Sequence, residues 1–312
     1  MVSLLASFIE KGIIDQQMAE EKQTKPSKRL TILTSCLALI AFASNSVLCR
    51  LALGDSSIDP AGFTGIRMLS GAITLTFIIL LASSKKLLIS RVFSVANSKG
   101  WFASAMLFSY AAFFSFAYVK LNTASGALIL FASVQFCMIG VSVFKRHRFQ
   151  LIEWLGVLIS FTGFILLMLP SATQPSFSGF VLMLIAGISW AFYTLAGRNT
   201  EDAILLTAEN FIRCVPFALV FMIISLSMYS ISWHGVWYAV ASGSIASGIG
   251  YSIWYLALRN LSITQAAISQ LSVPLIAALG GVVLINETLT NDLVISGGLI
   301  LIGIAIVSLK KT

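Results

Sequence analysis

The stretch K-L-N-T-A-S-G-A-L-I-L-F-A-S-V at residues 120–134 aligns without a gap with R-N-L-S-I-T-Q-A-A-I-S-Q-L-S-V at residues 259–273, an offset of 139 positions. Weaker matches continue outward in the same order: residues 42–50 with residues 190–198, Ile66 and Arg67 with Ile212 and Arg213, and Gly163 with Gly303. Apolar segments resemble one another by chance, so the colinear order of the matches is the evidence. It predicts an internal repeat of two halves.

The composition excludes an ordinary soluble protein. Of the 312 residues, 58% are hydrophobic and 10% are charged, whereas soluble domains carry about 25% charged residues. A transmembrane helix needs about 20 apolar residues, and ten runs of that kind follow one another: 30–53, 60–83, 101–119, 124–144, 151–170, 179–197, 204–228, 235–258, 263–286 and 292–309. The predicted fold is an all-α membrane protein with ten transmembrane helices.

The number of helices per half fixes the relation between the halves. Residues 30–170 form the first five-helix repeat and residues 171–312 form the second repeat with a short tail, so an odd number of crossings makes the two repeats inverted. Sixteen of the 20 Lys and Arg residues fall on the side of both termini and only Lys120 falls opposite. The positive-inside rule then predicts a multi-pass protein of the cell (inner) membrane, with residues 1–29 as a cytoplasmic tail.

The sequence lacks the residue patterns that several classes of function require. The four cysteines lie in apolar runs without metal-ligand spacing, and His147 and His234 are predicted on opposite sides of the membrane. There is no nucleophile-base set and no phosphate-binding loop, so we predict neither an enzyme nor a cofactor or metal site. The net charge of +8 fits cytoplasmic loops that face anionic lipid and does not imply nucleic acid.

Polar residues inside the predicted helices are the candidates for a site. A polar side chain in hydrocarbon costs free energy unless it faces a cavity or a partner. Aromatic walls with a few hydrogen-bonding groups suit a small amphipathic molecule, although packing between helices would explain any single residue equally well. The predicted substrate-binding residues are Asn45, Tyr110, Gln135, Trp190, Tyr193, Tyr251, Trp254 and Gln270.

A second set is predicted to be structural or gating, and comprises Arg67, Glu209, Arg213 and Pro274. Glu209 precedes Arg213 by four residues, so the two can pair on one helical face. This pair is either a structural ion pair or a proton-coupling group. Pro274 removes one backbone hydrogen bond, which either bends its helix or offers a carbonyl to a substrate.

At this point the sequence resembles a known family. The segments W-A-F-Y-T-L-A-G-R (190–198) and S-V-P-L-I-A-A-L-G-G-V-V-L-I-N-E-T-L-T (272–290), with the five-plus-five organisation, resemble the EamA-type transporters of the drug/metabolite transporter superfamily. The resemblance covers about residues 30–309, and Pro274 followed by Glu287 is its most specific part. The first half departs from this pattern, with Gln135 at the position of the proline and Arg148 at that of the glutamate.

The resemblance implies export or exchange of small metabolites such as amino acids, with the fifth and tenth helices at the periphery and the other eight around a central cavity. Inverted repeats allow alternating access to one midplane site. We therefore expect a secondary transporter whose partners are a small-molecule metabolite and the lipid bilayer, with a homodimer left open. The alternatives are a drug or cation exporter, which the lack of a central acidic residue disfavours, and a membrane sensor that binds without transport.

Overall fold

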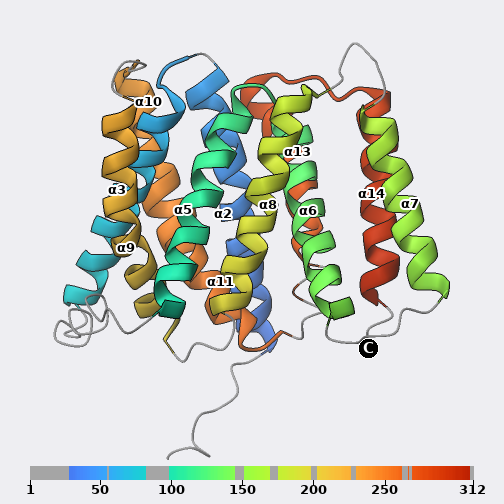
Figure 1. Cartoon of the computed structure of the whole chain (residues 1–312), viewed down its shortest axis with the longest axis horizontal. Helices are drawn as coiled ribbons and strands as arrows, with labels where there is room; N and C mark the ends of the chain where they lie inside the picture. Colours follow the sequence, from blue (N-terminus) through green and yellow to red (C-terminus); the bar gives the residue numbers. More distant parts are fainter. Residues whose placement is uncertain are drawn as a thin grey trace, which may run out of the picture.

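The computed structural model describes residues 28–54, 56–81, 98–144, 151–168, 175–197, 202–225, 230–261, 266 and 269–309. These residues form ten helical rods that stand side by side (Figure 1). In these ranges the only β-structure is an isolated bridge between Ile58 and Ile231. Most of the predicted N-terminal tail, residues 310–312 and Arg148 lie outside the described residues.

The rods follow the order of the predicted spans. The first five are α2 (Lys28–Gly54), α3 (Pro60–Leu81), α5 (Ser98–Tyr118), α6 (Thr123–Phe144) and α7 (Leu151–Met168). The others are α8 (Phe177–Gly197), α9 (Ala203–Ile224), a rod of α10 (Trp233–Ala241), η2 (Ser242–Ile249) and α11 (Gly250–Leu258), then α13 (Ser272–Ile285) and α14 (Asn291–Leu309). Six helices, namely α2, α3, α5, α6, α8 and α9, are long and apolar enough to cross a membrane. The all-helical fold and the number of ten helices are therefore confirmed.

Short polar residues start two of the helices. Oδ1 of Asp59 accepts hydrogen bonds from the backbone N–H groups of Ala61 and Gly62, at 3.0 and 2.8 Å. Pro60 follows at the first helical position of α3, where a missing N–H costs nothing. Oδ1 of Asp202 accepts from the backbone N–H of Leu205 at 2.9 Å and caps α9 in the same way.

Two helices stand apart from the rest, as the resemblance implies. The peripheral pair α7 and α14 lies at one edge of the bundle, at the right in Figure 1. Glycines bring their backbones together: a Cβ at Gly163 would meet the carbonyl oxygen of Ser296 on α14 at 2.8 Å, and one at Gly303 would meet that of Gly156 on α7 at 2.5 Å. The two glycines matched in sequence thus serve the same contact from opposite sides.

Two predicted helices differ in detail from the structure. The run 235–258 is not a uniform α-helix, because η2 in its middle is a π-helix. The run 263–286 is not one continuous helix, because Leu271 is a turn residue and α13 begins at Ser272. Pro274 therefore lies in the first turn of α13, where its missing N–H breaks no internal hydrogen bond. The prediction that Pro274 either bends its helix or offers a carbonyl to a substrate stays a prediction.

The glycine contact predicts a site-specific loss of stability. Replacing Gly303 by Leu forces side-chain atoms into α7, and overpacking of this kind costs about 1–3 kcal/mol, so we expect a lower midpoint of thermal unfolding in detergent. Gly298→Leu is the matched control on the same helix, because nothing lies within 4 Å of a Cβ there. Equal midpoints for the two variants would contradict the packing of α7 on α14.

Candidate functional site

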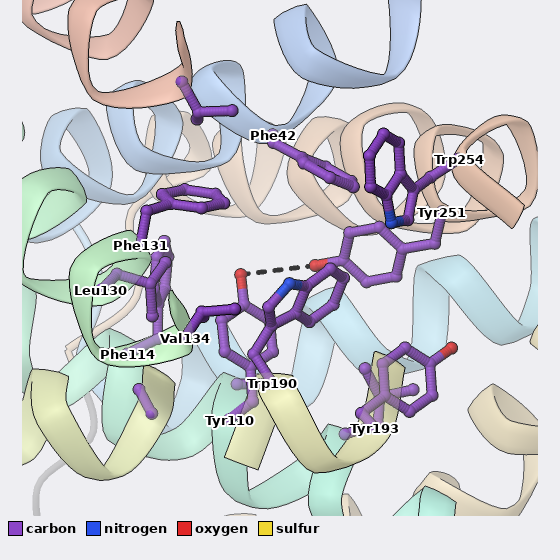
Figure 2. Close-up of a cluster of buried hydrophobic side chains, with 14 of the residues drawn as sticks. Phe42, Tyr110, Phe114, Leu130, Phe131, Val134, Trp190, Tyr193, Tyr251 and Trp254 are labelled. Carbon is purple, nitrogen blue, oxygen red and sulfur yellow. Dashed lines mark hydrogen bonds between the residues drawn. The ribbon is translucent and has the colours of Figure 1, made fainter. Parts of the chain in front are cut away.

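Aromatic side chains from four rods meet in the middle of the bundle. This central cluster comprises Phe42 of α2, Tyr110 of α5, Trp190 and Tyr193 of α8, and Tyr251 and Trp254 of α11, all of them buried (Figure 2). The ring centroid of Trp190 lies 4.9 Å from that of Tyr110 and 4.7 Å from that of Tyr251. Five of the eight predicted substrate-binding residues are thus brought together.

Arg67 of α3 reaches into the same cluster, although the sequence placed it with the gating residues. Its Nη2 donates to the hydroxyl of Tyr251 at 2.7 Å and to that of Tyr110 at 3.3 Å. Its guanidinium carbon also lies 5.3 Å from the ring centroid of Tyr110, within the range of a cation–π contact. Figure 2 shows the two tyrosine hydroxyls facing one another beside Trp190.

The π-helix supplies the polar side of the cluster. Nε of Arg67 donates to Oγ of Ser247 at 3.0 Å, and Ser247 donates to Oδ1 of Asn45 at 3.2 Å. Oγ of Ser242 donates to the same Asn45 oxygen at 2.7 Å. Two serines five residues apart share one face because a π-helix bonds i to i+5, and such segments often occur at functional sites. Asn45 therefore joins the cluster through this chain of hydrogen bonds.

The remaining predicted substrate-binding residues are Gln135 and Gln270. Gln135 of α6 and Gln270 are both buried, and Nε2 of Gln270 donates to the carbonyl of Ala266 in its own segment at 3.2 Å. Nη1 of Arg213 lies 3.5 Å from Oε2 of Glu209, which confirms the predicted pairing along α9.

A second polar group joins four helices at one end of the bundle. This interhelical clasp is formed by Arg50, Thr123, Glu287 and the carbonyl of Tyr118. Both carboxylate oxygens of Glu287 lie 3.0 Å from the backbone nitrogen of Thr123, which donates to them, and Nε of Arg50 lies 3.4 Å from Oε1. Nη1 of Arg50 donates to the carbonyl of Tyr118 at 3.3 Å. The carboxylate thus caps α6 while it pairs with a cation on α2.

The backbone explains how Glu287 reaches α6. Asn286 ends α13 in the left-handed conformation with a φ of 57°, which asparagine tolerates better than most residues. The resulting turn directs the next residue across to the N-terminus of α6. The clasp lies at the end of the bundle opposite to the start of α2 and the end of α14, which share one face in Figure 1.

The site contains residues that the sequence prediction missed. Phe42, Ser242 and Ser247 belong to the central cluster or its hydrogen bonds, and Arg50 of the clasp was not among the predicted site residues. The run S-G-S-I-A-S-G at residues 242–248 was the available signal, because small polar residues are unusual in an apolar helix. Among the described residues no group of three side chains could hold a metal ion.

Comparison with known proteins gives three kinds of match. The model of the EamA-like transporter family matches residues 177–309. An uncharacterized protein of Pseudomonas aeruginosa is 39% identical over 279 residues, covering 89% of this chain and 94% of that protein. A protein of Salmonella typhimurium named as a probable amino-acid metabolite efflux pump is 26% identical over 211 residues, covering 62% of this chain and 70% of the pump.

A solved crystal structure shares the fold. It aligns with a TM-score of 0.59 at 20% sequence identity, and the match covers 88% of this chain and 97% of that chain. At 20% identity this similarity shows a shared arrangement of the helices and does not indicate a shared ligand.

The clasp predicts a specific loss of stability. Glu287→Gln removes the charge that pairs with Arg50 and weakens the cap of α6, and charge-assisted hydrogen bonds of this kind are worth about 1.5–3 kcal/mol. We expect the unfolding midpoint in detergent to fall by about 3–6 °C. Thr288→Ala, at the exposed neighbouring position, should leave it within about 1 °C. A Glu287→Gln midpoint equal to that of the control would show that the clasp contributes nothing.

Proposed function

Because this chain belongs to the EamA-like transporter family of membrane proteins, we propose that it is a secondary transporter that exports a small organic metabolite by alternating access. The observation that carries the proposal is the central cluster, which combines side chains of α2, α3 and α5 with side chains of α8 and α11. Polar groups buried at this depth of an apolar bundle are expensive, and they typically mark a solute path.

The proposed mechanism uses two inverted repeats, residues 30–170 and residues 171–312. Helix packing supports this division. The repeat relates α2 to α8, and it relates α5 to the rod of α10, η2 and α11. The packing of α5 on α8 therefore has its counterpart in the packing of that rod on α2. The pairs α3 with α9, α6 with α13 and α7 with α14 each join related helices. Exchange of conformation between two such halves opens a shared site to either face in turn.

We propose that both termini lie in the cytoplasm and that the protein resides in the cell (inner) membrane. The start of α2 and the end of α14 lie at the same end of the bundle (Figure 1), and the excess of Lys and Arg in the connecting loops favours the cytoplasmic side for that end. The clasp would then lie at the outer end and close the central cluster from outside.

The proposed substrate is an amino acid or a related metabolite, moved outward. The name of the Salmonella relative, a probable amino-acid metabolite efflux pump, supports both the substrate class and the outward direction. The residues proposed to contact the substrate are Asn45, Tyr110, Gln135, Trp190, Tyr193, Tyr251, Trp254 and Gln270. Glu209 and Arg213 are proposed as a structural pair, and Pro274 as a structural residue at the start of α13.

Counterflow in proteoliposomes tests transport. Vesicles preloaded with an unlabelled amino acid should accelerate the entry of the same labelled amino acid, because only a carrier that reorients couples the two fluxes. Saturable binding without counterflow would instead identify a membrane sensor. Counterflow restricted to amines would identify a drug or cation exporter.

Replacing Trp190 by Leu should lower the counterflow rate at least about tenfold, because loss of a stacking and packing partner at the substrate costs about 1.4 kcal/mol or more. Trp237→Leu is the control, since this tryptophan is 56% exposed on the surface of α10. Both variants should insert to the same level. Equal transport by the two would remove Trp190 from the proposed site.

A further inference from the structure

The charge of Arg67 has no counter-ion in the described part of the chain. Its side chain is 0% exposed, and a guanidinium cannot lose its proton in a protein. Its hydrogen bonds go to three neutral hydroxyls, those of Tyr110, Ser247 and Tyr251, and no described carboxylate forms an ion pair with it. An unpaired buried charge is strongly destabilising unless another group compensates it.

Two other arginines inside the helices are each paired with a carboxylate. Arg213 is equally buried, and its guanidinium lies 3.5 Å from the carboxylate of Glu209. Arg50 lies 3.4 Å from the carboxylate of Glu287. Arg67 is therefore distinguished by its location as well as by its neighbours, because it is the arginine that reaches the central cluster.

The central cluster and the residues bonded to it include several donors that lack an acceptor. Nη1 of Arg67, Nε1 of Trp190 and Nε1 of Trp254 are buried and donate to no described residue. Nδ2 of Asn45, whose oxygen already accepts from two serines, is in the same condition. A buried donor without an acceptor costs about 1–3 kcal/mol. Four such donors favour a ligand that is rich in acceptors and negatively charged.

We propose that the central cluster binds the carboxylate of a small organic anion or zwitterion, with Arg67 as the carboxylate-binding residue. A carboxylate has about four acceptor positions and matches the planar fork of a guanidinium. Its single charge balances the single charge of Arg67, whereas a phosphate monoester carries about two at neutral pH. The rings of Phe42, Trp190 and Trp254 provide apolar walls for the remainder of the molecule. This inference rests on the proposed function of the site and specifies its substrate class.

Equilibrium binding to the purified full-length protein tests the class. The probes are L-phenylalanine, L-leucine and 3-phenylpropanoate, each compared with its own carboxamide, together with 3-phenylpropylamine as a cation of similar shape. We expect at least one carboxylate to bind at least about tenfold more tightly than its amide, and the amine not to bind. For the pair of 3-phenylpropanoate and its amide, which lack an amino group, the preference should be unchanged between about pH 6 and pH 9, because neither a carboxylate nor an arginine titrates there.

Variants of Arg67 test whether this residue causes the preference for the carboxylate over its amide. Arg67→Gln should abolish the difference between acid and amide, and Arg67→Lys should reduce this difference without abolishing it, because lysine keeps the charge but loses the fork. The matched control is the double variant Glu209→Gln with Arg213→Gln, which removes another buried arginine together with its partner. This control should keep the wild-type preference. If Arg67→Gln does not fold, Arg67→Lys and Tyr251→Phe carry the test, and both should weaken the acid more than the amide.

Several results would overturn the inference: equal binding of acid and amide, binding of the amine alone, no binding by any probe, or an unchanged preference in the Arg67 variants. Binding at equilibrium does not depend on transport, so its outcome is separate from that of the counterflow experiment. Counterflow of neutral or cationic solutes without any carboxylate preference would retain the transporter and reject the carboxylate site. Carboxylate binding without counterflow would reject the transporter and retain the site.

Discussion

A guanidinium that stays protonated at the centre of an apolar bundle is the constraint around which the middle of this protein is organised. Arg67 of α3 holds the hydroxyls of Tyr110 on α5 and Tyr251 on α11, and through Ser247 it connects to Asn45 on α2. In hydrocarbon these groups have no water to bind, so each hydrogen bond between them replaces one that water would have made. The π-helix supplies the two serines of this network, and the aromatic rings pack around it.

The clasp joins helices at one end of the bundle, whereas the central cluster joins helices in its middle. The clasp joins α2, α5, α6 and α13 through Glu287, and these helices must separate if the central cluster is to open at that end. The matching position of the first half is Arg148, which cannot form the same cap. The sequence of the first half therefore lacks the carboxylate that forms this cap, while α7 and α14 pack on one another at the edge.

The sequence predicted most of the fold because apolar length and charge placement are set by the membrane itself. It also grouped Tyr110, Trp190 and Tyr251 correctly, since aromatic residues at one depth of a bundle tend to meet. It did not predict that Arg67 joins this cluster, because the partners of Arg67 come from three other helices and no local spacing reveals them. The π-helix and the turn at Leu271 were missed because an apolar run of the right length predicts a span but not whether the helix within it is regular.

The central claim, that one site between two inverted halves opens to each face in turn, can be tested at a single position. In a chain whose four native cysteines are replaced, Ser247→Cys should react with a membrane-impermeant thiol reagent from either face, and a bound carboxylate should protect it from both. Reaction from one face only, under all conditions, would contradict alternating access to the central cluster.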